Sequence, residues 1–230
     1  MKNPLLSKHS NYSFRNAHSG FSLIEILVVI LIISILMTAG VLGLKNLAAG
    51  KGTSSAISTC ESLFNEARTI AIAKRCKTRV LIDINDNNKD EYLSRVAIAH
   101  QKINDDGTID PNAWILSNRA YALPAATYYS KEYSKLADGS DIPEASMSGE
   151  NFTARYAGNY AYYEFNAEGV SLNSGASFII GAGIRPKGQE PRFIRDAEKD
   201  VAGFVIWRNG RTSTYRNPEH MEIDSAKKNF

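Results

Sequence analysis

The chain has 230 residues, 43% hydrophobic and 22% charged, which is an ordinary globular composition and allows one domain with appendages. Its formal net charge of +3 comes from Lys2, Lys8 and Arg15, because the other 24 basic residues equal the 24 acidic ones in number. This balance gives little support to a nucleic-acid-binding protein. The two cysteines, which form no Cys-x-x-Cys pair, and the four scattered histidines give no support to a zinc site.

The first element is a basic segment, residues 1–20, which contains no acidic side chain. The apolar stretch 21–44 follows, and as a helix it would be about 36 Å long, enough to cross a hydrocarbon core of about 30 Å. Its centre, Ile26 to Ile33, is continuously apolar, and in lipid only a helix satisfies the backbone of such a run. Because basic segments beside a span stay in the cytoplasm, we expect a single-pass inner-membrane protein with its C-terminal domain extracytoplasmic.

Two ordinary explanations of this front end compete with a more specific one. A secretory signal would have an apolar region of about 7–15 residues followed by small residues, and Thr38-Ala39-Gly40 could imitate its cleavage site. A plain signal anchor fits the length, but it gives no purpose to Glu25, because a carboxylate at mid-bilayer costs about 2.5–3.5 kcal/mol. Near the end of the span, Glu25 could instead reach the interface as a surface charge.

The sequence GFSLIE at residues 20–25 resembles the type IV prepilin signature, Gly-Phe-[Thr/Ser]-Leu-x-Glu after a short basic leader and before an apolar run. The resemblance implies that residues 1–20 are a leader peptide, cleaved by a prepilin peptidase between Gly20 and Phe21 on the cytoplasmic side. It also implies N-methylation of the new Phe21 amine and a role for Glu25 in assembly. Residues 21–44 would first hold the subunit in the membrane and then line the core of a filament.

Elementary electrostatics gives Glu25 a purpose in this setting. After cleavage, Phe21 would carry an α-amino group, and Glu25 lies four residues on, about one helical turn away. The two charges can neutralise each other within a subunit or between neighbours, and a paired carboxylate costs much less in a low-dielectric bundle than a lone one. A subunit entering a filament would therefore dock in register.

Residues 45–76 are predicted to continue the helix in amphipathic form. Apolar residues recur at intervals of three or four: Ile57, Cys60, Phe64, Ala67 and Ala71. This face is expected to pack on a sheet, with Cys60 as a small core residue. In one helix Cys60 and Cys76 would lie about 24 Å apart, beyond the reach of about 7 Å between Cα atoms that a disulfide allows.

Residues 77–230 are expected to form a β-rich extracytoplasmic domain, because the pattern changes to strands after Cys76. The candidate strands are 80–84, 92–100, 113–116, 160–165, 177–180, 202–207 and 211–216. The last two should form a hairpin that turns at Asn209-Gly210, a strong two-residue turn signal. The predicted fold class is α+β: a pilin-like fold with a long N-terminal helix packed on an antiparallel sheet.

A weaker resemblance extends into this domain. Residues 63–82, 162–170 and 205–216 are similar, in that order, to the helix-to-strand passage, strand-turn and terminal hairpin of GspH/FimT-type minor pseudopilins and pilins. The stretch 124–158 has no such counterpart. It is rich in Tyr, Ser and Gly, and a long variable loop or insertion is expected there.

Candidate chemistry is sparse. Residues 83–92 and 104–110 are rich in oxygen ligands, but the first lacks the Gly and Glu of an EF-hand at Asn88 and Ser94, so polar hairpin turns are expected at both. His100 and His220 have no nucleophile at motif spacing, and no hydrolase, zinc-protease or phosphate-loop motif occurs. We therefore expect no enzyme activity and no cofactor or metal.

From this resemblance we expect a structural minor pilin or pseudopilin subunit of a type IV pilus or a type II secretion pseudopilus. Its implied partners are the prepilin peptidase, other pilins, an inner-membrane platform protein and, through the platform, an assembly ATPase. One alternative is a minor pilin that binds DNA for uptake, through the basic C-terminal residues Arg208, Arg211, Arg216, Lys227 and Lys228. Acidic residues intervene there, which favours a mixed solvated surface. Another alternative is a membrane-anchored binding domain that never polymerises.

Overall fold

The computed structural model describes residues 23–86, 89–117, 120–193 and 200–215, without the side chains of residues 35–51 and Phe193. The expected leader, Gly20 and Phe21 lie outside these residues. The chain divides into two compact units, residues 1–44 and 45–230, each of which is described by itself. The helix α1, Leu23–Lys74, contributes residues to both.

In the N-terminal unit, all of the described side chains of α1, residues 23–34, are exposed. The large apolar ones, from Leu23 to Ile33, leave 45–85% of their surface uncovered. Among the helical residues with described side chains, no stretch combines the length and hydropathy that a membrane span needs.

In the second unit, α1 ends in a C-cap that the sequence pattern did not reveal. Arg75 adopts a positive φ of 53°, and the amide of Cys76 donates to the carbonyl of Ala71 at 3.3 Å. This is the Schellman arrangement, which normally uses glycine at the position of Arg75. Lys74 in the last turn complements the negative end of the helix dipole. The chain can therefore turn directly from the helix into the first strand.

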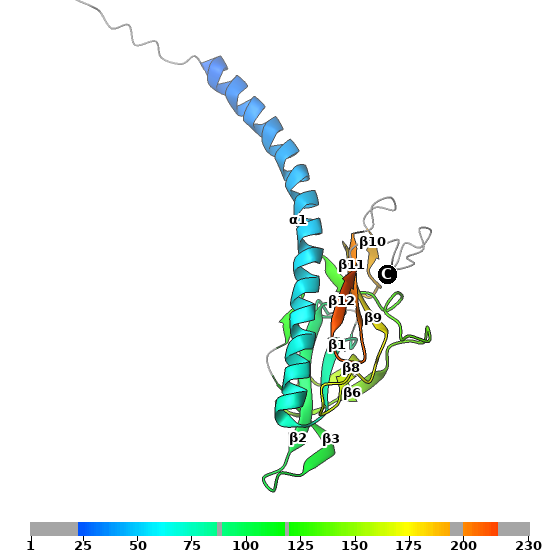
Figure 1. The fold of residues 1–230 in the computed structure, drawn as a ribbon. Helices are drawn as coiled ribbons and strands as arrows, with labels where there is room; N and C mark the ends of the chain where they lie inside the picture. Colours follow the sequence, from blue (N-terminus) through cyan, green and yellow to red (C-terminus); the bar gives the residue numbers. More distant parts are fainter. Residues whose placement is uncertain (1–22, 87–88, 118–119, 194–199, 216–230) are drawn as a thin grey trace, which may run out of the picture. The chain divides into compact units, whose positions relative to one another are not determined.

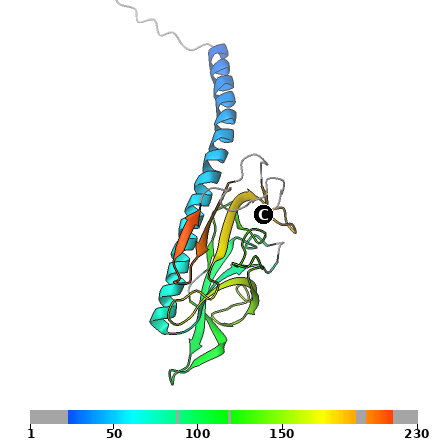
Figure 2. The same ribbon diagram turned by 45° about the vertical axis from the view of Figure 1, so that its right-hand side comes forward.

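A seven-stranded sheet follows, in the order β6-β8-β1-β2-β3-β7 with β4 paired to β2. Its strands are β1 Thr78–Asp83, β2 Arg95–Ile103, β3 Ile109–Leu116, β4 Tyr121–Ala122, β6 Glu144–Met147, β7 Gly149–Glu150 and β8 Gly158–Phe165. All pairs are antiparallel except β3 with β7. The β2–β3 hairpin projects beyond the end of α1 in both views of the fold (Figures 1 and 2).

A second, five-stranded sheet is entirely antiparallel and has the order β10-β9-β11-β12, with β5 also paired to β9. Its strands are β5 Thr127–Tyr129, β9 Ala176–Ile184, β10 Arg192–Phe193, β11 Val201–Ile206 and β12 Thr212–Tyr215. The hairpin predicted at Asn209-Gly210 is confirmed: β11 pairs with β12, and Gly210 takes the positive φ of 74° that the turn requires.

The C-terminal half of α1 packs its apolar face on both sheets (Figure 1). Phe64 lies at the centre and is fully buried. Its ring meets Tyr163 and Phe165 of β8 edge-on, with centroids 5.2 and 6.3 Å away. It meets Phe178 of β9 and Phe204 of β11 in the same way, at 5.3 and 5.0 Å. One helical side chain thus joins the two sheets in a single core.

The expected fold class, a long helix packed on antiparallel β-structure, is confirmed. Two details differ. The strand expected from Tyr92 begins only at Arg95, because Leu93 takes a positive φ of 56° inside a turn. The loop expected over 124–158 is partly ordered into β5, β6 and β7. The two cysteines, Cys60 and Cys76, are free and buried.

Segment 124–158 also covers the outer face of the seven-stranded sheet. Met147 and Phe152 from this segment pack with side chains of β1, β2, β3 and β8 in a second buried cluster: Leu81, Ala97, Ala99, Trp114, Leu116 and Tyr160. The sheet is therefore covered on both faces, and its strands carry apolar residues at successive positions rather than in strict alternation.

Candidate functional site

The predicted assembly residue, Glu25, lies in the first turn of α1 and is exposed. A carboxylate there interacts favourably with the positive end of the helix dipole. The large apolar side chains around it, Leu23 to Ile33, are exposed as well. Gly20 and Phe21, the predicted processing residues, lie outside the described residues, so their proposed roles depend on the sequence motif.

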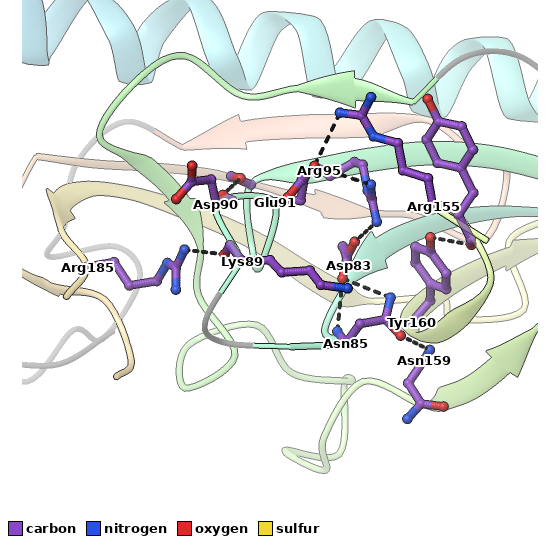
Figure 3. A network of polar contacts seen from close by, with 12 residues as sticks. Asp83, Asn85, Lys89, Asp90, Glu91, Arg95, Arg155, Asn159, Tyr160 and Arg185 are labelled. Carbon is purple, nitrogen blue, oxygen red and sulfur yellow. Dashed lines mark hydrogen bonds and ion pairs between the residues drawn. The ribbon is translucent and has the colours of Figure 1, made fainter. Parts of the chain in front are cut away.

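The Asp/Asn-rich segment 83–92 forms the connection between β1 and β2, as the predicted hairpin turn requires. Both carboxylate oxygens of Asp83 are engaged within the protein (Figure 3). Oδ1 accepts hydrogen bonds from the backbone and side-chain nitrogens of Asn85 at 2.9 and 3.0 Å, and Oδ2 accepts one from Arg95. Among the described residues, no cluster of three or more His, Cys, Asp or Glu side chains could hold a metal ion.

Arg95 connects this turn to segment 149–157. Its guanidinium is nearly buried beside Asp83 and lies 5.2 Å from the ring centroid of Tyr156. Glu91 lies 3.9 Å from Arg95 and accepts a hydrogen bond from Arg155 at 3.2 Å. The pKa of Glu91 is lowered, first by the hydrogen bond from its own amide and then by Arg155 and Arg95. The buried Asp83–Arg95 pair and its neighbours therefore hold the β1–β2 turn against the inserted segment.

Arg185 extends the same network to the β9–β10 connection. Its guanidinium donates to the carbonyl of Lys89 at 2.5 Å and lies 5.5 and 5.8 Å from the rings of Tyr92 and Tyr128. Tyr92 donates its hydroxyl proton to Glu190 at 2.7 Å. Figure 3 shows Arg185 and Arg155 approaching the 83–95 segment from different parts of the domain. The segment 83–92, whose oxygen-rich residues resemble metal ligands in sequence, thus contributes to contacts between the two sheets.

His100 has a neighbouring hydroxyl that motif spacing did not reveal. Its Nδ1 lies 2.7 Å from the Ser117 hydroxyl, and its Nε2 lies 2.8 Å from the Lys74 ammonium nitrogen. Because an ammonium group only donates, Nε2 must accept, and Nδ1 must carry the proton that it gives to Ser117. Burial, and then the charge of Lys74, lower the pKa of His100.

This arrangement of protons is the reverse of what nucleophilic catalysis needs. A general base must accept the proton of the serine hydroxyl, whereas His100 donates to Ser117 and its other nitrogen is occupied by Lys74. The cluster instead attaches the end of α1 to β2 and to the residue after β3. Its chemistry is that of a structural contact.

Two other predicted features have simple local structures. The turn within 104–110 is a polar hairpin turn, in which Asp106 accepts hydrogen bonds from the amide and hydroxyl of Thr108, and Gly107 has a φ of 81°. Of the basic C-terminal residues, Arg208 and Arg211 flank the β11–β12 turn, and the other three lie outside the described residues.

Sequence comparison places one known motif on the chain. The family described as the prokaryotic N-terminal methylation motif matches residues 15–41, a range that includes Gly20, Phe21 and Glu25. No curated protein matches the chain in sequence.

Two of the solved structures similar to this chain are of one protein, the minor pseudopilin EpsH from the type II secretion system of Vibrio cholerae. They share 16% and 14% identity with this chain, with TM-scores of 0.36 and 0.40. Each alignment covers 72% of this chain, and 93% and 95% of the respective EpsH chain.

The match over residues 15–41 agrees with the motif found at residues 20–25. The chain thus carries the prokaryotic N-terminal methylation motif over residues 15–41.

Proposed function

We propose that the chain is a structural minor pilin or pseudopilin subunit, which works by assembling into a type IV pilus or a type II secretion pseudopilus. The observation that carries this proposal is the N-terminal methylation motif at residues 15–41. The similarity of three domain segments to GspH/FimT-type proteins supports the minor-subunit class. The proton arrangement at His100, which is unsuited to nucleophilic catalysis, agrees with a non-enzymatic role.

The proposed maturation begins with residues 1–20 as a cytoplasmic leader. A prepilin peptidase cleaves between Gly20 and Phe21, and the new amine of Phe21 is methylated. Residues 21–44 anchor the subunit in the inner membrane in a single pass, and the domain from residue 45 onward is extracytoplasmic. Other pilins, a platform protein and an assembly ATPase acting through that platform are the proposed partners.

Glu25 is proposed to direct assembly through its charge. The apolar side chains from Leu23 to Ile33 are exposed and must be covered by lipid or by other helices. In either medium a carboxylate is stabilised by an opposite charge, and the amine of Phe21 is one helical turn away. Pairing between Glu25 and this amine, within or between subunits, would favour a single register.

The mass of the mature N terminus tests the processing step. The full chain is co-expressed with a prepilin peptidase, and its N-terminal peptide is analysed by mass spectrometry. We expect a chain that begins at Phe21 and carries one additional methyl group. An intact residue 1 in the presence of active peptidase, or cleavage after Ala39, would contradict the proposal.

Substitution of Glu25 tests the assembly step separately. Glu25→Ala should be processed normally but should enter filaments poorly, because the charge that sets the register is lost. Glu66→Ala, which removes an exposed glutamate from the same helix inside the globular domain, is the matched control and should assemble as the wild type does. Filaments that form from Glu25→Ala at wild-type efficiency would show that the docking mechanism is wrong.

A further inference from the structure

The β2–β3 hairpin, which projects beyond the end of α1 (Figure 1), carries an exposed apolar pair. Ile103 and Ile109 lie opposite each other in the register, and 38% and 41% of their surface is exposed. A bulge between Gln101 and Lys102 shifts the register just before this pair, and bulges re-aim the side chains beside them. The two isoleucines belong to neither buried cluster of the domain, so the hairpin offers them to a neighbouring molecule.

The same hairpin tip is acidic. Asp105 and Asp106 are exposed in its turn, and Asp110 begins the returning strand beyond the apolar pair. Lys102 faces Asp110 across the strands, and its Nζ lies 3.4 Å from a carboxylate oxygen of Glu150. Two such tips would bring like charges together, which disfavours a tip-to-tip contact between copies. A surface that accepts the tip must therefore combine an apolar side chain with basic ones.

The last turns of α1 have this combination. Ile72 is 45% exposed, with Arg68 four residues before it and the exposed Arg75 three residues after it. Gly169, in the turn after β8, fixes the first two side chains. Its carbonyl accepts a hydrogen bond from Nε of Arg68 at 3.2 Å, and a Cβ at Gly169 would lie 2.7 Å from Cδ1 of Ile72. Glu168 adds one acidic side chain at the margin. The surface is thus preformed and basic on balance.

The hairpin tip and the end of α1 lie at nearly the same height in the domain. Nε2 of His100, on β2, lies 2.8 Å from Nζ of Lys74 in the last turn of α1. Ile103 follows three residues later, about 10 Å further on at about 3.3 Å per residue. Two copies that stand side by side in the same direction, offset by about 10 Å along α1, therefore bring Ile103 of one beside Ile72 of the other.

We propose that the hairpin tip of one copy docks on the last turns of α1 in a second copy of this chain, with Ile103 and Ile109 against Ile72 and the acidic turn beside Arg75. The contact is heterologous, so it can repeat from copy to copy, as a filament requires. It rests on the proposed function, because one hairpin tip buries far less than the roughly 1,000 Å² of a stable complex. Anchored helices that hold the copies side by side supply the missing effective concentration.

Cysteine crosslinking between two differently tagged full-length copies in the inner membrane tests the contact. One copy carries Ile109→Cys and the other Thr69→Cys, which lies three residues before Ile72 on the same helix face. The native Cys60 and Cys76 are 0% and 1% exposed and do not compete. We expect a crosslinked pair of the two tags on oxidation with copper phenanthroline.

The matched control replaces Thr69→Cys by Ser58→Cys, another exposed hydroxyl residue on α1, about 16 Å away. It should give little crosslinked product. The proposal is overturned if no crosslink forms with Thr69→Cys, or if Ser58→Cys crosslinks equally well. It is also overturned if two Ile109→Cys copies crosslink to each other as efficiently, because that would be a tip-to-tip contact.

Charge reversal identifies the partners on each side. Ile103→Asp in the hairpin copy should lower the crosslinked fraction about fivefold or more, as loss of a central apolar contact does. Asp105→Lys in the hairpin copy and Arg75→Glu in the helix copy should each lower it on the order of threefold, and the two together should recover it. Failure of the combined variants to recover the crosslink would overturn the assigned pairing.

The N-terminal mass of the same samples separates this contact from the proposed function. A chain that is processed at Phe21 but gives no crosslink overturns the contact and leaves the proposed function standing. A chain that crosslinks as expected but keeps residue 1 supports the contact and contradicts the proposed function.

Discussion

Replacing Phe64 by alanine should destabilise the globular domain more than any other single change on the apolar face of α1. The side chain is fully buried and makes edge-on contacts with four rings, two from each sheet. Loss of a core phenylalanine costs about 3–5 kcal/mol, and each aromatic pair adds about 0.5–1.5 kcal/mol beyond its buried area. We therefore expect a loss near the upper end, about 5 kcal/mol.

The measurement is guanidinium or thermal unfolding of the full chain in mild detergent, monitored by near-UV circular dichroism. For a domain of this size, a loss of about 5 kcal/mol lowers Tm by about 10–20 °C. Phe64→Leu, which keeps part of the volume but none of the ring contacts, should fall between the wild type and Phe64→Ala.

Ile72→Ala provides the control for helix position. Ile72 lies on the same half of α1 but is 45% exposed, so its truncation should cost less than about 1 kcal/mol. If Phe64→Ala costs no more than Ile72→Ala, the two sheets do not share a core through Phe64, and the packing argument fails.

Three further predictions concern charges. Arg95→Met should cost about 3–5 kcal/mol because it leaves Asp83 buried without its partner, whereas Asp83→Leu/Arg95→Met should recover most of that loss, as unfolding titrations can measure. The pKa of His100 is lowered in the fold, so the unfolded chain binds the proton more readily than the folded chain does. The free energy of unfolding should therefore decrease as pH falls through about 6.5, the unfolded pKa, towards the folded pKa. His100→Asn should make that decrease smaller. DNA binding by the full chain should be weak and insensitive to salt; a steep salt dependence that disappears in Arg208→Ala/Arg211→Ala would favour the DNA-uptake alternative.

The features that could be predicted from the sequence are those set by local pattern. The helical face through Ile57 and Phe64 and the Asn209-Gly210 hairpin depend on periodicity and turn chemistry, which act over a few residues. The helix end was harder to place, because its C-cap uses Arg75 with a positive φ, where the pattern would favour glycine.

The remaining features depend on contacts between distant segments. The Asp83–Arg95–Glu91–Arg155 network joins residues up to 72 positions apart, and no spacing rule marks Arg155 as a partner of the β1–β2 turn. Segment 124–158 looked like a loop because its strands are two to four residues long and buried by Met147 and Phe152, which alternation does not reveal. The contact between Ser117 and His100 is likewise not predictable from motif spacing, because it forms only when the strands pair in the folded domain.

The helix α1 carries two glutamates in different surroundings, Glu25 and Glu61. Glu61 accepts hydrogen bonds from the hydroxyls of Thr212, at 3.2 Å, and Thr214, so it attaches α1 to β12 within the domain. A structural role accounts for Glu61, since its partners lie in the same fold. Glu25 lies among exposed apolar side chains, from Leu23 to Ile33. Burying a carboxylate within an apolar surface is costly unless the group that covers the surface brings an opposite charge next to it. This cost is the physical basis of the proposal that Glu25 acts in the docking of another charged helix end.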